Sequence, residues 1–300
     1  MVNISDISVF DRRRFKYGLI RAMPNFNDFN FLHSWGKNHI LDRLSDVNRQ
    51  FENALCIGSR CPITAGDHDK IRYGVVSDIT ETPVSSFNAP YLCADEEFLP
   101  LNPKSLDFIT SNLNLHHVND LPGSLLQIRR ALKNDGLFLA SMMGGETLHE
   151  LRSCMMQAEL DLYGGVSPRV FPFADKPQMG DLLQRAGFAL PVVDSDVITV
   201  TYDNIFKLMA DLRGMGEGNT IIARNKNFEN KAFFMRVAEL YHEKFAESDG
   251  RIVASFEVIF LLGWAPDASQ QKPLRPGSAE HSLAEALGAS EIKTGDKTAP

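Results

Sequence analysis

The sequence predicts an α/β fold: a Rossmann-like, seven-stranded, mostly parallel sheet with helices on both faces. Short apolar segments alternate with amphipathic segments through the first half of the chain, and two more strand-like segments follow. Such alternation is typical of parallel sheets, because two parallel strands can be joined only through a crossover segment, most often a helix.

The clearest unit is a strand–helix–strand segment between Leu106 and Gly144. Strand-like residues 106–112 and 136–144 bracket a segment in which Leu121, Leu125 and Ile128 recur at helical spacing. Asn119 or Asp120 is expected to cap this helix, and residues 134–136 are expected to end it. Ligands of such sheets lie at the carboxyl ends of the strands, where polar and glycine residues gather here.

The other elements follow from the same reasoning and give a three-part organisation. A helical cap is expected over residues 1–50, with the arginine run at 12–14 as a solvated face. The main domain is expected to cover residues 51–265, with a helical insertion around 203–248, and residues 266–300 are expected to be a disordered tail. Further strands are expected at 53–58, 72–78, 90–95, 188–202 and 254–264. Helices are expected at 146–163 and 181–186 and from a cap at Asp203.

The composition excludes several classes of protein. The 300 residues are 44% hydrophobic and 23% charged, and the net charge of −7 argues against a nucleic-acid partner. The four cysteines form no C-x-x-C pair, which favours free thiols in a reducing compartment. No apolar stretch approaches the length needed to cross a bilayer, so no transmembrane segment is expected.

Several segments resemble class I S-adenosylmethionine-dependent methyltransferases. They include the strand at 53–58, the acid Asp78 twenty residues after Gly58, and ADEEFLPL at 94–101. Three others, GGVSPRVFPF (164–173), DLPGSL (120–125) and DLRGMGEGN (211–219), resemble the mitochondrial complex I assembly factor family and its α-proteobacterial relatives. A looser resemblance connects the chain to the malonyl-carrier-protein methyltransferases of biotin synthesis.

The resemblance implies a set of site residues at the carboxyl ends of the strands. Those expected at the cofactor are Gly58, Asp78, Ile79, Asp95, Glu96 and Asn112. Those expected at the substrate are His116, His117, Gly144 and Gly145. Residues 214–218, GMGEG, form a glycine-rich segment that we call the glycine loop. Candidates for substrate contact at this loop are Arg213, Glu217 and Arg224, although an exposed salt bridge explains them equally well. No catalytic residue is identified.

The glycine motif of the family, D-L-G-C-G-x-G, is degenerate in this chain. The residues at 56–62 read CIGSRCP, so Cys56 stands at the acid, Arg60 at the second glycine and Pro62 at the third. The glycines let the backbone approach the cofactor closely, whereas Arg60 adds bulk and a positive charge near a sulfonium. We therefore expect S-adenosylmethionine binding to be weak or lost.

Two histidines and a carboxylate, as in His116, His117 and Asp120, are the ligand types of a non-haem iron site. Adjacent histidines seldom converge on one metal, however, and Asp120 is better placed as a helix cap. The sequence therefore predicts no metal site.

The resemblance implies a protein that acts on a protein side chain during respiratory complex I assembly, by arginine hydroxylation or by methylation. One alternative is a non-catalytic assembly chaperone on the same fold. Another is a methyltransferase acting on a small molecule or a carrier protein. The implied partner is a subunit of NADH–quinone oxidoreductase, and we expect a cytoplasmic bacterial protein that reaches the inner membrane through this partner.

Overall fold

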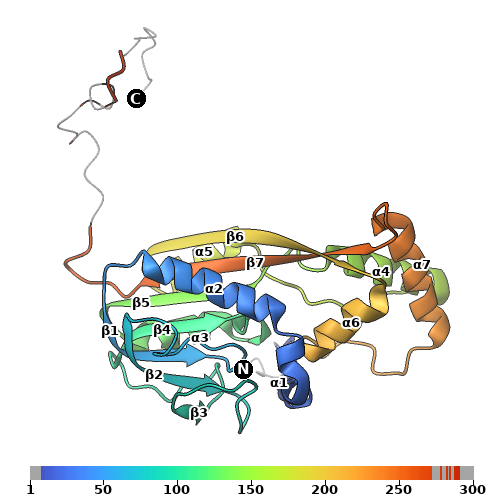
Figure 1. Cartoon of the computed structure of the whole chain (residues 1–300), viewed down its shortest axis with the longest axis horizontal. Coiled ribbons are helices and arrows are strands. Elements are labelled where there is room, and N and C mark those ends of the chain that lie inside the picture. Colours follow the sequence, from blue (N-terminus) through green and yellow to red (C-terminus); the bar gives the residue numbers. More distant parts are fainter. Residues whose placement is uncertain (1–7, 272–277, 279–281, 283, 285–286, 291–300) are drawn as a thin grey trace, which may run out of the picture. The chain divides into compact units, whose positions relative to one another are not determined.

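The computed structural model describes residues 8–271, 278, 282, 284 and 287–290 (Figure 1). In this part of the chain, a seven-stranded sheet runs in the order β3-β2-β1-β4-β5-β7-β6. The five strands from β3 to β5 are parallel, whereas β7 is antiparallel to both β5 and β6. The predicted fold class is confirmed. The strands are β1 (Phe51–Ile57), β2 (Ile71–Asp78), β3 (Tyr91–Cys93), β4 (Leu106–Asn112), β5 (Leu132–Met143), β6 (Ala189–Tyr202) and β7 (Ile252–Trp264).

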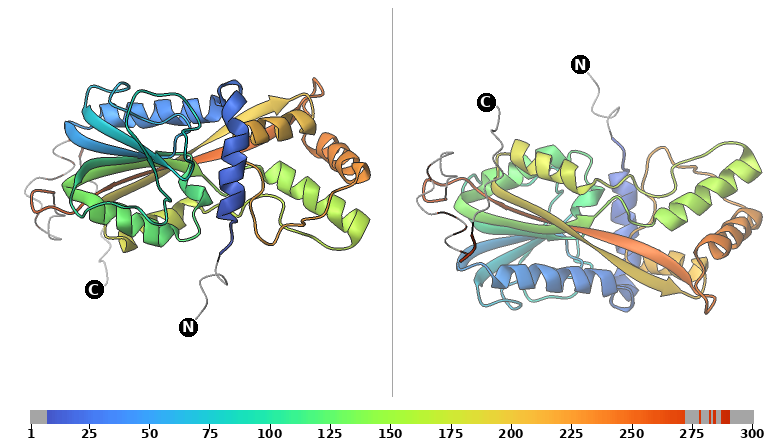
Figure 2. Two further views of the ribbon diagram at one scale, coloured as in Figure 1. Left: turned by 90° about the horizontal axis from the view of Figure 1, so that it is seen from below. Right: turned by 90° about the horizontal axis from the view of Figure 1, so that it is seen from above.

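Helices cover both faces of the sheet (Figure 2). The long helix α2 lies on one face, and α3 and α5 lie on the other, each over its own buried apolar cluster. The helices are α1 (Arg12–Ala22), α2 (Phe31–Ser45), α3 (Leu121–Ala131), α4 (His149–Tyr163), α5 (Lys176–Arg185), α6 (Ile205–Gly214) and α7 (Lys231–Phe245). Two short 3-10 helices, η2 (Met23–Asp28) and η3 (Leu115–His117), complete the set.

The connection from β1 to β2 contains no helix in the residues described, 58–70. It is rich in Gly, Pro and Asp, which disfavour a helix. Part of the β2 surface is therefore uncovered, and Tyr73 is 62% exposed. The carboxyl end of β2 is instead closed by Phe15, Phe26 and Val84, which form a small buried cluster.

The strands β6 and β7 extend beyond the rest of the sheet and carry a second group of helices (Figure 1). There α4 packs on α7 and on β7, and α6 packs on β6. The chain after α6 then returns to the N-terminal segment, where the Asp11 amide donates to Thr220 O at 2.8 Å and the Ile222 amide donates to Val9 O at 2.9 Å. This return brings the 214–219 loop to the carboxyl ends of the central strands.

Three local expectations were wrong. Asn204, not Asp203, caps α6 by accepting from the amides of Phe206 and Lys207. Helix α5 begins at Lys176, earlier than expected, because Asp175 and Gln178 form a reciprocal capping box. Helix α3 ends at Ala131, and residues 132–136 already belong to β5, where Leu132 pairs with Leu106 across an irregularity in the register.

The predicted tail at 266–300 lies largely outside the described residues. Residues 267–300 form a unit separate from residues 1–266, and within it the Ser269 hydroxyl donates to the Asp267 carboxylate at 2.7 Å. No helix in the described part of the chain is long and apolar enough to cross a bilayer.

Replacing Phe138 by Ala should lower the free energy of unfolding by about 3–5 kcal/mol, the usual loss for a buried aromatic residue. Phe138 lies in β5, is fully buried and stacks on Phe188 with ring centroids 5.4 Å apart. Urea unfolding followed by circular dichroism measures the loss. The control Leu126→Ala, at a 55% exposed position on α3, should cost less than about 0.5 kcal/mol. Equal losses in the two variants would contradict this account of the core.

Candidate functional site

Asp78, the acid expected to bind a ribose, accepts hydrogen bonds from within the protein. Its carboxylate accepts hydrogen bonds from the backbone amide and the hydroxyl of Ser59, both at 2.7 Å. Ser59 in turn accepts from the amide of Val84, so the segment after β2 closes over the pair. Asp78 and Ser59 are both fully buried, and Asp78 is thus a structural residue in this conformation.

The degenerate glycine motif forms a packed loop. Gly58 has a φ of +98° and lies so close to Asn114 that a Cβ would be 3.0 Å from that side chain, which explains why glycine is needed there. Burial raises the pKa of the Cys56 thiol to about 12, so this residue stays neutral and does not replace the missing carboxylate. The Arg60 side chain is 1% exposed and fills the space beside the loop.

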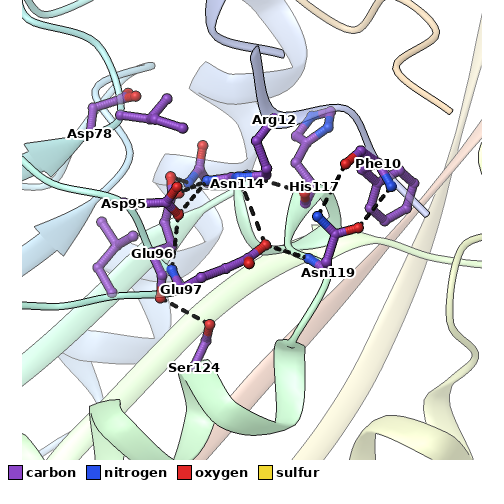
Figure 3. Close-up of polar contacts among 12 residues, drawn as sticks. Phe10, Arg12, Asp78, Asp95, Glu96, Glu97, Asn114, His117, Asn119 and Ser124 are labelled. Atoms are coloured by element: carbon purple, nitrogen blue, oxygen red, sulfur yellow. Dashed lines mark hydrogen bonds and ion pairs between the residues drawn. The ribbon is translucent and has the colours of Figure 1, made fainter. Parts of the chain in front are cut away.

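The acidic segment after β3 is held by Arg12 of α1 (Figure 3). The Arg12 guanidinium pairs with Asp95 at 2.9 Å, forms a shorter ion pair with Glu96, and lies 3.8 Å from Glu97. The Asn114 amide donates to the other oxygen of Glu96 at 2.6 Å, and Glu96 is 1% exposed. The expectation that the arginine run is a solvated face was therefore wrong for Arg12, whose side chain is 14% exposed.

These residues do not fit S-adenosylmethionine. The family's contacts to a ribose and to an adenine amino group would fall on Asp78 and Asp95. Ser59 occupies Asp78 Oδ2 and Arg12 pairs with Asp95, whereas the buried Asp78 Oδ1 has no hydrogen-bond partner among the described residues. The buried Arg60 side chain also fills the space beside the degenerate glycine motif, and Arg12 covers the acidic segment after β3. We therefore assign no chemical step to this cofactor.

The other expected site residues have mostly structural surroundings. The Asn112 amide donates to His33 O at 2.9 Å and its carbonyl accepts from Ser141, which ties β4 to α2 and β5. Ile79 packs in the Phe15 cluster. A Cβ on Gly144 would be 2.6 Å from the Glu257 side chain, so glycine is required there for packing. Gly145 borders a shallow hollow together with Arg152 and Phe173.

His116, His117 and Glu217 form a buried cluster at the carboxyl end of β4. Both histidines lie in η3, and Glu217 comes from the loop after α6. Glu217 Oε2 is 3.3 Å from His116 Nε2 and 3.0 Å from His117 Nε2. The three side chains are 1%, 0% and 3% exposed. The sequence placed Glu217 at the glycine loop but gave no sign that it meets these histidines.

Arg60 holds the other oxygen of Glu217. Its Nη1 atom is 2.5 Å from Glu217 Oε1 and also donates to Met215 O at 3.1 Å, while its Nη2 atom donates to Leu113 O at 2.9 Å. Burial alone would raise the pKa of Glu217, but the Arg60 cation and the hydrogen bond with His116 leave that pKa well below its ordinary value. Burial lowers the pKa of His117 to about 3, so its imidazole is neutral.

A mainly apolar cavity of about 410 Å³ lies beside this cluster, and Glu217 is one of its lining residues. Phe171 and Phe173 also line it, and their rings contact His117 and His116 at centroid distances of 5.2 and 5.9 Å. The rest of the wall comes mostly from α4, α6 and residues 169–173, and includes Met143, Leu151, Met155, Phe206, Met209 and Phe234.

A second, basic hollow of about 560 Å³ lies between α1 and the glycine loop. It shares Arg213 and Gly218 with the apolar cavity. Its charged lining residues are Asp11, Arg13, Arg14, Arg21, Arg213 and Arg224. Arg224 pairs with Asp11 at 3.7 Å, so the predicted salt-bridge interpretation applies to this residue.

Comparison with known proteins assigns the chain to a family. Residues 71–140 match the family described as methyltransferase domain. The protein named arginine-hydroxylase NDUFAF5, mitochondrial, of Danio rerio is 35% identical over 93% of this chain and 89% of its own length. The Mus musculus protein of the same name is 37% identical over 97% of this chain and 87% of its own length. The chain belongs to the NDUFAF5 family.

Other proteins match over a smaller part of the chain or at lower identity. The malonyl-[acyl-carrier protein] O-methyltransferase of Gallionella capsiferriformans is 37% identical to this NDUFAF5 relative, over 58% of each chain. A putative methyltransferase from Bacillus halodurans has a TM-score of 0.51 and 16% identity, covering 76% of this chain and 97% of its own. The YcgJ protein of Bacillus subtilis has a TM-score of 0.52 and 16% identity, covering 77% and 99%. These structures show the fold alone.

Removing Arg12 should destabilise the protein, because it leaves Glu96 buried without its counter-charge. We expect Arg12→Ala to lower the free energy of unfolding by about 3 kcal/mol. The matched control is Lys16→Ala on the same helix, because Lys16 pairs with the 70% exposed Glu81. That variant should lose less than about 1 kcal/mol. If Arg12→Ala also lost less than about 1 kcal/mol, the proposed role of Arg12 would be contradicted.

S-adenosylmethionine should bind the wild-type protein weakly or not at all, because Arg60 fills the space beside the degenerate glycine motif and Arg12 pairs with Asp95 and Glu96. Isothermal titration calorimetry with the cofactor and with S-adenosylhomocysteine should give no saturable heat at micromolar ligand. A dissociation constant in the micromolar range or below would show that the site opens and would overturn this prediction.

Proposed function

We propose that this protein modifies an arginine side chain of a partner protein, by hydroxylation. The proposed partner is a subunit of NADH–quinone oxidoreductase, and the modification would take place during assembly of that complex. The support is the family membership together with the cavity that Glu217 lines. The reaction would insert one atom of dioxygen into a C–H bond and reduce the other to water, with two electrons from a cellular reductant.

The cavity carries this proposal because its chemistry matches an arginine side chain. An arginine combines a long apolar stem with a planar cation. The stem can pack against the methionine, leucine and phenylalanine residues of the wall, and the cation would then lie near Glu217, whose own carboxylate is already paired with Arg60. Arg169, another lining residue, is already neutralised by Glu159 and Glu229, each at 2.5 Å, and so repels such a guest less.

The basic hollow offers a place for the flanking part of the same partner. Its arginines outnumber its single acid, Asp11, and it adjoins the apolar cavity through Arg213 and Gly218. A peptide with its arginine in the cavity could therefore place acidic neighbours in the hollow.

A non-catalytic assembly chaperone is the second candidate. The observation that favours it is the occupied cofactor site, with Arg60 at a glycine position and Arg12 on the acidic segment. Methyl transfer, whether to a protein, a carrier protein or a small molecule, is disfavoured by the same observation.

Deleting the gene should lower the amount of assembled NADH–quinone oxidoreductase and remove one oxygen atom from an arginine of one of its subunits. Native gels measure assembly, and peptide mass spectrometry of the subunits measures the modification. Complementation with wild-type protein should restore both. Complementation with Glu217→Gln should fail to restore the oxygen, whereas Glu243→Gln, at an exposed position on α7, should restore it.

The outcomes separate the candidates. A gene-dependent gain of one methylene group would support methylation, and reduced assembly with unchanged subunit masses would support the chaperone. Normal assembly with normal subunit masses in the deletion strain would overturn the assembly-factor proposal altogether.

A further inference from the structure

His116, His117 and Glu217 place three metal-ligand atoms within 4.8 Å of one another, and all three residues are buried. We propose that these residues bind a divalent first-row transition metal ion, with Fe²⁺ as the physiological candidate. Two imidazoles and one carboxylate are the protein ligands of non-haem Fe²⁺ sites that leave positions open for other ligands. The role of this metal ion rests on the proposed function, but metal binding itself can be measured whether or not the protein hydroxylates arginine.

The distances suit one shared ion. Donors about 2.1 Å from a metal ion are separated by about 3.0–3.4 Å when they occupy neighbouring tetrahedral or octahedral positions. Glu217 Oε2 lies 3.3 Å from His116 Nε2 and 3.0 Å from His117 Nε2, so these two pairs are within that range, and the three ligand atoms all lie within 4.8 Å of one another. Small movements of the side chains would therefore suffice to seat an ion between them.

The hydrogen bonding of His117 points to a missing ligand. Among the described residues, neither nitrogen of its ring has a hydrogen-bond partner, although Nε2 is 3.0 Å from Glu217 Oε2. The ring is fully buried, and a buried polar group without a partner costs about 1–3 kcal/mol. A metal ion between His117 Nε2 and Glu217 Oε2 would give Nε2 a partner, and Nδ1 would keep its present surroundings.

Arg60 and the adjacent phenylalanines would hold the ligands in place. Arg60 binds Glu217 Oε1 and leaves Oε2 facing the histidines, which is how an outer partner orients a carboxylate ligand. Phe15 stacks on His117 with ring centroids 4.0 Å apart and limits its rotation. The positive charge of Arg60 opposes a second cation, so we expect micromolar rather than nanomolar affinity.

The position of the cluster suits a role in the reaction. Glu217 lines the apolar cavity, so an ion on its carboxylate would lie at the wall of the proposed arginine-binding site. Open positions of that ion would be reachable from the cavity by water or another small ligand. Asp120, the carboxylate considered from the sequence, instead accepts from the Gly123 amide at 2.9 Å and caps α3.

The test is metal titration of the purified full-length chain, without an affinity tag and after treatment with a chelator. Co²⁺ serves as the spectroscopic probe, and Fe²⁺ is added without oxygen. We expect one ion per chain, a visible Co²⁺ absorption band that saturates, and an X-ray absorption spectrum of the Co²⁺ protein that shows two imidazole nitrogens. His116→Gln and Glu217→Gln should each weaken binding by about 100-fold, whereas His242→Gln, at an exposed position on α7, should not.

Failure of this inference and failure of the proposed function are distinguishable. If the wild-type protein retains no ion, or if its bound Co²⁺ has no imidazole ligand, the metal site is wrong even if arginine is hydroxylated. The spectrum of the wild-type protein decides this without the variants, so a variant that fails to fold does not obscure the result. Metal binding with unmodified subunits would leave the site in place and contradict the hydroxylation.

Discussion

The buried ion pair between Arg60 and Glu217 connects the segments that build the site. Arg60 follows β1, Glu217 follows α6, and their 2.5 Å contact spans 157 positions of sequence. The same guanidinium also donates to Met215 O and Leu113 O, so it holds the glycine loop against the end of β4. A buried charge is tolerated only when it is paired and hydrogen-bonded, and these contacts meet that condition.

The same pair links the degenerate cofactor site to the histidine cluster. A glycine at position 60 would leave room beside the loop, but it would also leave Glu217 without its cation. With arginine there, the space is filled and the carboxylate is held facing His116 and His117. The chain therefore keeps the fold of a methyltransferase while its residues build a different polar site.

The sheet and most helices could be predicted from the sequence because their signals are local. The spacing of Leu121, Leu125 and Ile128 defines α3, and a stretch rich in Val, Ile and Thr defines β6. Errors arose where neighbouring residues compete for one role, as with Asp203 and Asn204 at the start of α6. The sequence did not predict the pairing of Arg12 with Glu96, because the two residues are 84 positions apart. Hydrophobic periodicity indicates local structure and cannot indicate a contact over that separation.

The sequence predicted the edge of the sheet at which the candidate site lies, but not all of the residues that form it. The polar residues that follow β1 and β4 must meet, because these two parallel strands are neighbours in the sheet. Strands β2 and β3 are added on one side of this pair and β5 on the other, which is where such sheets bind ligands. That argument places Gly58, His116 and His117 at this edge of the sheet, where the structure has them. It cannot select Glu217, because the extended β6 and β7 and their helices determine where the glycine loop returns. The fold still offers its usual ligand-binding point between β1 and β4, but Arg60 now fills the β1 side. The proposed metal site therefore consists of the imidazoles on the β4 side and the carboxylate brought by the glycine loop.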